Sequence, residues 1–386
     1  MSHIDDLIRD LCPDGVEYKP LGEILNYEQP GPYLVSSKEY NLSYPTPVLT
    51  AGATFILGHT NEQHGIYSAS QDSPAIIFDD FTTASKWVDF PFKAKSSAMK
   101  ILTSSSGDPV DLRYTYYVLE ALNYTPSTHS RHWISIFSNM PIAFPPRKVR
   151  EYIVSTLNRF KALEAELEVE LEARRQQYFH YCTSAFDSAT NVEWTTLERV
   201  SLKISSGGTP SSSNSAYYGG NIPWVRSQDV NFNMISSTSA TISDIGLKNS
   251  AAKWIPSNSL IIAMYGASAA RAAINTIPVT TNQACCNLQL DATKVTPRYA
   301  YHWIYSQYNK LRSLGEGSQS NLNSRKIKNY PIPVPSLNEQ RRITDALDQF
   351  HSLVNDLTSG LPAEIKARRK QYEYYRDRLL TFPEKK

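Results

Sequence analysis

The chain has few cysteines, and their spacing matches neither a metal site nor a disulfide framework. Cys12, Cys182, Cys285 and Cys286 are the four cysteines among 386 residues, and none forms a CxxC pair or a Cys/His ligand pattern. Reduced thiols are expected. The chain also lacks an apolar run long enough to cross a membrane, and its first residues, MSHIDDLIRD, do not resemble a signal peptide. We therefore expect a soluble, cytoplasmic protein with no membrane partner.

The sequence lacks the motifs of the common enzyme and cofactor sites. It contains no GxGxxG, GxxxxGK[ST], HExxH or GxSxG, and no Asn/Asp-Pro-Pro-aromatic motif of an amino-methyltransferase. Asp79-Asp80 follows a strand-like run and could serve a metal-dependent nuclease. An acidic pair at a strand end more often caps the turn, and no Glu-x-Lys follows it. We expect no catalytic, cofactor-binding or metal-binding residue in this chain.

A long, uninterrupted helix pattern occupies the middle of the chain. Residues 147–182 contain neither Gly nor Pro, and at ~1.5 Å per residue they would span about 54 Å. Glu164 interrupts the apolar seam, and Leu163 beside it could cover the gap. The seam recurs every 3.5 residues, at Ile153, Leu157, Phe160, Leu167, Leu171 and Tyr178. Such a helix cannot bury its stripe alone, so it needs a partner helix.

The partner pattern lies near the end of the same chain, at residues 341–375. An offset of 190 relates the first five seam residues to Ile343, Leu347, Phe350, Leu357 and Leu361. An offset of 194 then relates Ala173-Arg174-Arg175, Tyr178 and Tyr181 to Ala367-Arg368-Arg369, Tyr372 and Tyr375. The second copy therefore carries four extra residues, which include or adjoin Gly360 and Pro362. This internal repeat divides the chain into two halves.

Each half also carries a region of short strand-like runs followed by a helix pattern. The predicted strands lie at 47–49, 54–57, 75–78 and 98–102 in the first half, and at 222–225, 260–264 and 286–290 in the second. The predicted helices are 112–121 and about 298–311. Residues 113–116 match 298–301, the opening 15–24 matches 191–200, and the proline-rich 141–145 matches 331–335. These proline-rich segments are predicted to be extended connectors into the long helices.

The predicted fold is α+β: two α/β domains of short strands and helices, joined by two long antiparallel helices in a pseudo-twofold arrangement. The expected parts are an N-terminal segment (1–20) near the C-terminal helix, a first domain (21–146), a central helix (147–190), a second domain (191–336) and a C-terminal helix (337–386). Residues 197–336 carry 13 basic and 5 acidic side chains, a net charge of +8, whereas 21–146 carry −4. The second domain suits a polyanion. The first has only a local cluster, for which a solvated face is an equal alternative: Lys86, Lys93, Lys95 and Lys100.

Several motifs, in this order and with this repeat, resemble the specificity (S) subunit of type I restriction-modification systems. Gly207-Gly-Thr-Pro-Ser211 followed by Tyr217–Val225 is similar to the opening of a target-recognition domain of that family, and 317–323 leading to 331–335 is similar to its close. Residues 338–343 and 367–376 resemble the family's helical regions. In the first half, 47–52, 78–83 and 93–97 resemble one subgroup of these domains, although the GGTPS opening is missing there.

The resemblance implies a non-catalytic DNA reader. Each globular domain would recognise one half of an asymmetric, bipartite double-stranded DNA site, and the helices would set the spacing and dock two methyltransferase (M) subunits. Motor-nuclease (R) subunits would join for cleavage. No cofactor would bind this chain, and S-adenosylmethionine, ATP and Mg would belong to the partner subunits.

Polar residues in loops after strands, or in the family-like closing motif, are the candidate DNA contacts, because Arg and Lys favour guanine edges and phosphates and Asn and Gln favour adenine. In the second domain they are Arg226, Gln228, Tyr265, Arg271, Gln319, Asn321 and Arg325. In the first they are Thr82, Thr83, Lys86, Lys93, Ser127, His129 and Arg131. Three other functions remain open: a helical adaptor without a DNA role, a self-sufficient nuclease or methyltransferase, and an S-like subunit of a fused restriction system.

Overall fold

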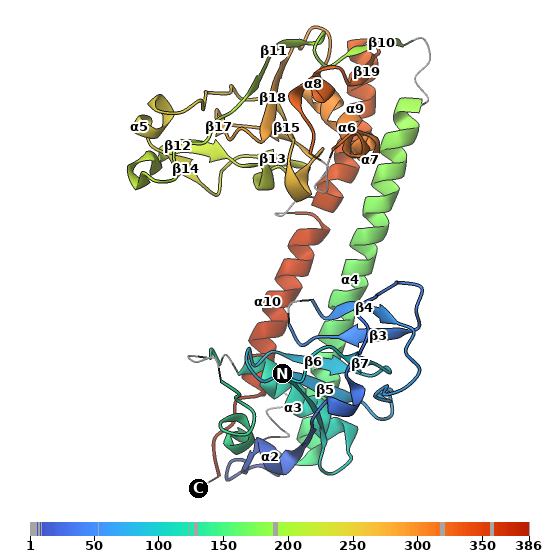
Figure 1. The fold of residues 1–386 in the computed structure, drawn as a ribbon. Coiled ribbons are helices and arrows are strands. Elements are labelled where there is room, and N and C mark those ends of the chain that lie inside the picture. The colour runs from blue at the N-terminus through green and yellow to red at the C-terminus, as the bar shows by residue number, and fades with distance from the viewer. Residues whose placement is uncertain are drawn as a thin grey trace. The chain divides into compact units, whose positions relative to one another are not determined.

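The computed structural model describes residues 6, 8, 10–52, 54–122, 124–126, 130–187, 192–316, 321–355 and 359–385. It forms two compact units: unit 1 is Met1–Ala165 with Ala367–Lys386, and unit 2 is Glu166–Lys366. Each unit combines sheets and helices (Figure 1). The mixed helix-and-strand fold expected from the sequence is confirmed.

Unit 1 is built on two small sheets. The larger, in the order β2-β8-β5-β6, is antiparallel and contains β2 (Leu25–Glu28), β5 (Ala75–Asp79), β6 (Ser85–Val88) and β8 (Met99–Ser104). The smaller, β4-β3-β7, contains β3 (Thr46–Leu49), β4 (Ile56–Thr60) and β7 (Lys93–Ala94). Ile76 and Phe78 of β5 pack with the helices, whereas Ile77 packs with Leu49 of β3. Burial on both faces explains why this strand is continuously apolar.

Unit 2 repeats this plan. Its larger sheet, β11-β18-β15-β16-β13, contains β11 (Ser201–Ser206), β13 (Asn233–Ile235), β15 (Leu260–Ala263), β16 (Ala272–Asn275) and β18 (Cys285–Leu290). Its smaller sheet, β14-β12-β17, contains β12 (Tyr218–Val225), β14 (Thr241–Ile242) and β17 (Thr280–Thr281). The central strands β3 and β12 each pair antiparallel with one neighbour and parallel with the other. The internal repeat therefore extends through both sheets, and only β13 is added.

The helices of the two units begin in the same way. α3 (Pro109–Ala121) has Asp108 as its N-cap, and α6 (Pro297–Ser306) has Thr296; both cap side chains accept a backbone N–H, and both helices have Pro in their first turn. The single helix expected near 298–311 is interrupted at Gln307, after which α7 (Tyr308–Ser313) follows. Shorter helical elements complete the units: α2 (Leu21–Ile24), η1 (Gly31–Tyr33), η2 (Phe137–Asn139), η3 (Ser215–Tyr217), η4 (Ser227–Asp229), α5 (Asp244–Lys248), η5 (Gly266–Ser268) and α8 (Ser324–Lys328).

The proline-rich segments form strands rather than unpaired connectors. β9 (Pro141–Ala143) pairs antiparallel with β1 (Tyr18–Pro20), and β19 (Pro331–Val334) pairs in the same way with β10 (Glu193–Thr196). Each ribbon has only two strands, so the prolines occupy edge positions, where a missing N–H is tolerated. In each unit the segment that opens the globular domain thus lies against the segment that closes it.

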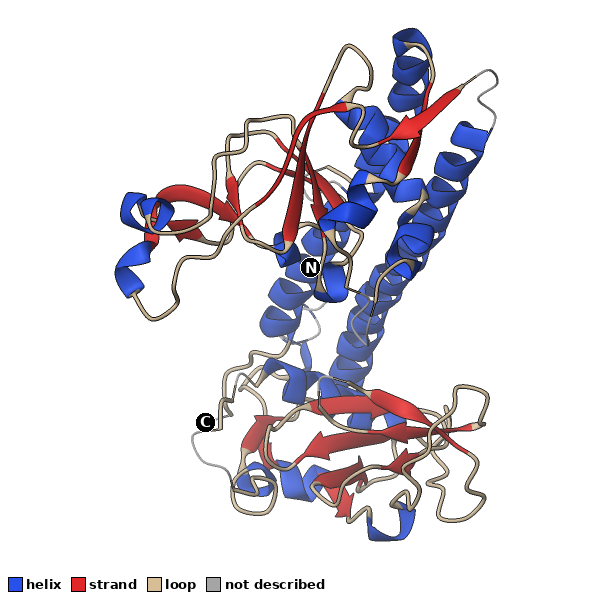
Figure 2. Ribbon diagram, turned by 45° about the horizontal axis from the view of Figure 1, so that its top comes forward, coloured by secondary structure: helices blue, strands red, loops and turns tan. Residues whose placement is uncertain are grey.

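The central helix α4 (Arg147–Asp187) is continuous over 41 residues. The C-terminal copy is two helices, α9 (Leu337–Asn355) and α10 (Leu361–Leu379), with Gly360 and Pro362 at the start of the second. Pro is tolerated in the first turn of a helix but not in its interior, which places the break there. Figure 2 shows these helices in blue beside the red strands of each unit.

Helix pairing is antiparallel within each unit. In unit 1, Phe160 stacks on Tyr375 with ring centroids 5.3 Å apart, and Glu164 pairs with Arg369. In unit 2, Tyr181 lies 4.9 Å from Phe350, ring centroid to centroid. Leu163 is 46% exposed, so the expectation that it covers the gap at Glu164 is wrong; Glu164 is itself held by an ion pair.

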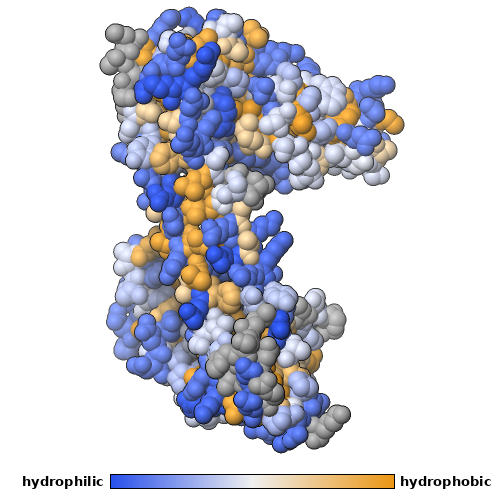
Figure 3. Space-filling model, turned by 180° about the vertical axis from the view of Figure 1, so that it is seen from behind, coloured by the Kyte–Doolittle hydropathy of each residue, from blue (hydrophilic) through white to orange (hydrophobic). Residues whose placement is uncertain are grey.

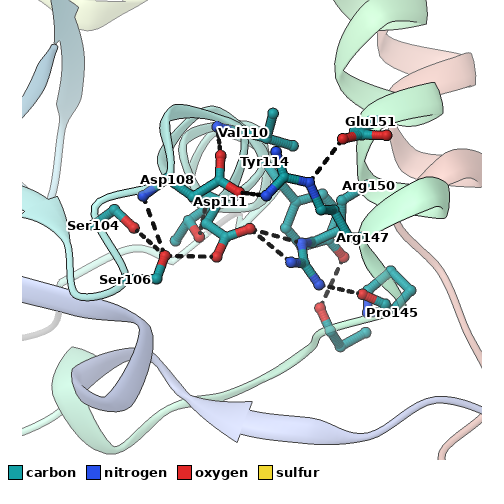
Figure 4. A network of polar contacts seen from close by, with 12 residues as sticks. Ser104, Ser106, Asp108, Val110, Asp111, Tyr114, Pro145, Arg147, Arg150 and Glu151 are labelled. Carbon is teal, nitrogen blue, oxygen red and sulfur yellow. Dashed lines mark hydrogen bonds and ion pairs between the residues drawn. The ribbon is translucent and has the colours of Figure 1, made fainter. Parts of the chain in front are cut away.

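A buried polar network joins α3 to the start of α4 in unit 1 (Figure 4). The guanidinium of Arg150 donates from Nε and Nη2 to one oxygen of Asp111, at 3.0 and 2.7 Å, and also donates to the Pro145 carbonyl. In unit 2 the repeat places Gln340 where unit 1 has Arg150. The amide of Gln340 donates to the Pro335 carbonyl at 3.0 Å and accepts from the N–H of Thr296 at 2.9 Å. The ion pair of Arg150 with Asp111 in unit 1 and the neutral amide of Gln340 in unit 2 therefore connect corresponding helices.

The segment before β1 in unit 1 is hydrogen-bonded to the segment that follows α10. The N–H of Val16 donates to the carbonyl of Pro383 at 2.9 Å, and the N–H of Lys385 donates back to the Val16 carbonyl. The Tyr18 hydroxyl donates to the Phe382 carbonyl at 2.9 Å. The described part of the N-terminal segment thus packs against the residues that follow α10.

Candidate nucleic-acid interface

In unit 2 the loop between β15 and β16 carries the first candidate residues. Its backbone is held by two hydrogen bonds of 2.9 Å between Ala263 and the pair Ala270 and Arg271. Gly266 and Ala270 adopt left-handed backbone angles, with φ of 73° and 69°. This tight loop leaves the Tyr265 ring 40% exposed at the end of the sheet.

Other candidate loops reach the same end of that sheet. The Met264 carbonyl accepts from the N–H of Leu322, and the Gly266 N–H approaches the side-chain oxygen of Asn321 at 3.5 Å. Next to η5 lies η4, where Gln228 is exposed. The structure therefore brings together three of the predicted residues, which with their loops we call the β15 loop surface: Gln228, Tyr265 and Asn321.

Arg226 holds the start of η4, which carries Gln228, and the GGTPS motif packs against β17. The N–H of Arg226 donates to the Asp229 carboxylate at 2.9 Å, and its guanidinium donates to Ser239 at 3.0 Å, so the start of η4 is fixed. Gly207 lies so close to Thr281 that a Cβ would stand 1.9 Å from its carbonyl oxygen. The next exposed residue, Thr209, bonds to the side chain of Gln283. Thr209 and Gln283 are exposed polar residues that the sequence did not single out, because nothing local marks the turn after β17.

The other candidates of unit 2 lie elsewhere. Arg271 turns toward Asn231, donating to its side-chain oxygen at 2.6 Å. Arg325 is exposed on α8, in a separate hollow with Lys326 and Asn329. Gln319 lies outside the described residues.

In unit 1 the equivalent loop, between β5 and β6, carries Thr82 and Thr83. The Asp79 carboxylate accepts the N–H groups of Phe81 and Thr82, at 2.9 and 2.7 Å, and Thr83 adopts a left-handed φ of 61°. The hydrogen bond from the Asp79 N–H to the Ala84 carbonyl matches that from Ala263 to Arg271 in unit 2. Thr82 is exposed at the tip. Candidates from both halves therefore occupy the same loop of the repeated sheet.

Asp80 is a structural residue of this loop. Its side chain is 1% exposed, faces Lys100 at 3.0 Å, and accepts the N–H groups of His132 and Trp133 at 3.0 and 2.8 Å. Lys100 is completely buried. One carboxylate oxygen thus holds residues 132–133 against the sheet and the other faces Lys100, a structural role of the kind expected for an acidic pair at a strand end.

The lysine cluster of unit 1 is divided by the fold. Lys93 is 3% exposed, and its ammonium binds Glu62 at 2.8 Å and the His64 carbonyl at 2.6 Å. This burial overturns Lys93 as a candidate, because no surface remains for a phosphate. Lys86 is half-buried on β6, and Lys95 is exposed beside Tyr40. Arg131 is exposed next to the fixed residues 132–133, whereas Ser127 and His129 lie outside the described residues.

The helix residues predicted for the spacer form the cores in which each unit packs its helices. Ile153 and Leu157 are buried in unit 1, where Phe160 packs at the edge. Leu171, Ile343, Leu347 and Leu361 are buried in unit 2, and Leu167 and Phe350 are partly buried there. Leu357 lies outside the described residues.

Each unit also contains a second polar network, formed by residues at corresponding positions of the repeat. In unit 2, His302 lies 2.7 Å from Asp348 and 2.7 Å from the Tyr178 hydroxyl, and Arg298 pairs with Asp348. In unit 1, Arg113 and the Tyr117 hydroxyl donate to Asn158, the residue that corresponds to Asp348. Burial lowers the pKa of His302. Burial alone would raise the pKa of Asp348, but the bonds from His302 and Arg298 outweigh it and lower that pKa to about 2. Neutral His302 therefore donates to Asp348 and accepts from Tyr178.

Other kinds of site have no counterpart in the described part of the chain. No group of three His, Cys, Asp or Glu residues there is placed to hold a metal ion. Its four cysteines are buried and form no disulfide. Within the same residues, none of the helices combines the length and apolar character of a membrane-spanning segment.

Comparison with known proteins matches both the sequence and the fold. Residues 191–367 match the family model described as the type I restriction modification DNA specificity domain. The chain is 42% identical to the EcoR124I/EcoR124II specificity subunit of Escherichia coli, over 99% of this chain and 98% of that one. It is 32% identical to the EcoprrI specificity subunit of the same organism over about half of each chain, 50% and 51%.

A solved S subunit of the type I system of M. genitalium covers 95% of this chain with 96% of its own, at 14% identity and a TM-score of 0.53, which shows a shared fold. The 42% identity to the Escherichia coli specificity subunit, across nearly the whole length, shows the family as well as the fold. This chain belongs to the specificity subunits of type I restriction-modification enzymes, the non-catalytic components that recognise DNA sequence for separate catalytic subunits.

Proposed function

We propose that each unit reads one half of an asymmetric, bipartite double-stranded DNA site. The carrying observation is that one sheet plan occurs twice with different loops at the same place. Unit 1 presents the threonine-bearing turn Asp79–Ala84, and unit 2 presents Tyr265 with Gln228 and Asn321. Two readers with a shared frame and different side chains suit a site whose halves differ in sequence.

The helices would set the spacing and dock two methyltransferase subunits, with motor-nuclease subunits joining for cleavage. Support comes from a groove between α4 and α9 in unit 2, of about 370 Å³, lined by Tyr181, Ala185, Ile343, Ala346, Leu347 and Phe350. Figure 3 shows apolar surface along the helical segments. Val169 of α4 is 72% exposed. Exposed apolar patches of this kind mark protein interfaces. S-adenosylmethionine, ATP and Mg would be held by those partners, in the cytoplasm.

The test is to co-express the chain with the methyltransferase subunit encoded beside it and map methylated adenines across a genome. A single gapped, bipartite motif is the expected result. Methylation without a gapped motif would exclude the proposal, and a chain that binds the methyltransferase but shifts no DNA would favour an adaptor. Methylation by the purified chain alone would establish a self-sufficient enzyme.

Replacing Gln228 with Ala should relax one base position in one half of the motif and weaken binding by ~1–3 kcal/mol, because a side-chain contact to a base edge is lost. Thr82→Ala should change only the other half. Motif mapping by single-molecule sequencing measures both. An equal loss of affinity for all sequences would instead make Gln228 a backbone contact.

Deleting four residues from the 357–362 segment should change the permitted length of the gap while leaving both half-motifs intact. Four residues are about one helical turn, ~6 Å of rise. The gap length is read from the same methylation map. A folded deletion variant that methylates the original gap length would refute the idea that the helices measure spacing.

A further inference from the structure

Unit 2 contains a cavity that the recognition of base edges by the β15 loop surface does not use. It has a volume of about 450 Å³, within the range of small-ligand sites. Its lining comes from α4, α6, α7, α9 and the loops before β13 and β16: Arg175, Phe179, Asn231, Phe232, Arg271 and Tyr305, with Tyr308, Asn309 and Asn355. Two guanidinium groups and four aromatic rings thus meet around one space.

Unit 1 has a cavity at the equivalent place, and it shows what unit 2 lacks. The repeat relates Arg175 to Arg369, Phe179 to Glu373, and Tyr305 to Glu120, and all three residues of unit 1 line its cavity. There the positive charges are met within the chain: Arg369 pairs with Glu164, and Lys161 lies 3.3 Å from Glu120.

In unit 2 each of those carboxylates is replaced by an apolar or aromatic residue. Val354 stands where unit 1 has Glu164, and it is completely buried. Among the described residues, no carboxylate lines the unit 2 cavity, and none forms an ion pair with Arg175 or Arg271. Arg271 donates to the neutral side chain of Asn231 at 2.6 Å, so neither guanidinium group is neutralised by a described carboxylate. Two such groups beside a shared space favour an anion supplied from outside the chain.

The remaining lining favours a flat, aromatic ligand with polar edges. Phe232 holds a left-handed φ of 53°, which places its ring 4.7 Å from that of Tyr305 and 5.4 Å from that of Tyr308. A strained non-glycine backbone is retained where the surrounding structure enforces it. The side-chain nitrogen of Asn355 is buried and makes no hydrogen bond. Aromatic faces stack on bases, and carboxamides bond to base edges.

We propose that this cavity, at Arg175, Phe179, Phe232, Arg271 and Tyr305, binds a nucleotide unit: the guanidinium groups hold the phosphate and the aromatic rings hold the base. A free nucleotide and a nucleotide of a bound DNA strand share this chemistry. The DNA source rests on the proposed function, whereas the free-nucleotide source is independent of it.

The test uses the full chain co-purified with its methyltransferase subunits. Deoxyadenosine 5′-monophosphate, deoxyadenosine and inorganic phosphate are titrated by ligand-observed NMR, and a duplex carrying the mapped motif is titrated by fluorescence anisotropy. The variants are Arg175→Gln, whose side chain is exposed, and Phe179→Glu, which installs the acid that unit 1 has at this position. Arg369→Gln is the matched control at the equivalent site.

Saturable binding of the monophosphate, weakened about tenfold or more by Arg175→Gln and Phe179→Glu but not by Arg369→Gln, would establish the free-nucleotide source. If the monophosphate does not bind but both variants weaken the duplex about tenfold, at all sequences, the nucleotide is that of DNA. Unchanged binding of both probes in variants that keep their thermal transition and their methyltransferase would overturn the site. Equal binding of inorganic phosphate and the monophosphate would overturn the nucleotide assignment. A missing gapped motif in the unmodified complex would count against the proposed function instead.

Discussion

Asp80→Ala should destabilise unit 1 by about 3–5 kcal/mol, because it leaves the ammonium of Lys100 buried without its counter-charge. Lys100 is 0% exposed and lies within a core strand, so water cannot replace the carboxylate. The same substitution removes the acceptor of the Trp133 N–H, whereas the His132 N–H keeps the Asp80 carbonyl at 2.9 Å. Trp133 should therefore loosen from the sheet, and under the proposed function recognition of one half-motif should weaken with it.

Hydrogen exchange followed by mass spectrometry would measure this loss strand by strand, which suits a chain of two units that need not unfold together. Faster exchange is expected in β5 and β8, with unit 2 unchanged. Asp72→Ala, at an exposed position of the same unit, is the control and should stay within about 0.5 kcal/mol. The pair Asp80→Leu with Lys100→Met should recover much of the stability, since a buried ion pair can be replaced by apolar side chains. An Asp80→Ala chain as stable as the control would show that Lys100 finds another partner.

Arg150→Ala should cost about 3 kcal/mol or more, because it leaves the Asp111 carboxylate buried beside the first turn of α4. Asp111 is 7% exposed and would retain one side-chain donor, Ser106, at 2.9 Å. The contact between α3 and α4 should loosen, which exchange of the first two turns of α4 would report.

The equivalent residues of unit 2 indicate a second substitution that should offset this loss of stability. Combining Arg150→Gln with Asp111→Thr places in unit 1 the residues that unit 2 has at the equivalent positions, Gln340 and Thr296, where the Gln340 side chain accepts from the Thr296 backbone N–H. The double variant should be more stable than Arg150→Gln alone, because no carboxylate is left without a partner. A double variant less stable than the single one would mean that the two connections are not interchangeable.

The sequence predicted the helical frame well because its information is local and periodic. The seam of residues 147–182 and its offset copy identified α4, α9 and α10, and the Gly360–Pro362 segment indicated where the copy breaks. The repeat of the sheets was invisible, since β5 and β15 share a place in the topology but little sequence. Only the hydrogen-bond register reveals that Ala84 and Arg271 are equivalent.

The candidate site was predicted less well, because exposure depends on partners far away in sequence. From the sequence alone Lys93 is predicted to be a surface residue. In the structure it is buried in an ion pair with Glu62, 31 residues earlier. Thr209 and Gln283 meet across 74 residues, and no local pattern announces that contact. Gln228, Tyr265 and Asn321, by contrast, could be predicted as loop residues, although their convergence could not.

The paired strands that open and close each globular domain have an evolutionary consequence. Pro20 is the register partner of Pro141, and Thr196 is that of Pro331, so each domain leaves the helical frame and returns to it at a single point. A foreign domain with the same two ends could be inserted by one recombination event without altering the register of the frame helices. Under the proposed function, new pairs of DNA targets would then arise by exchanging modules, rather than by gradual redesign of an interface.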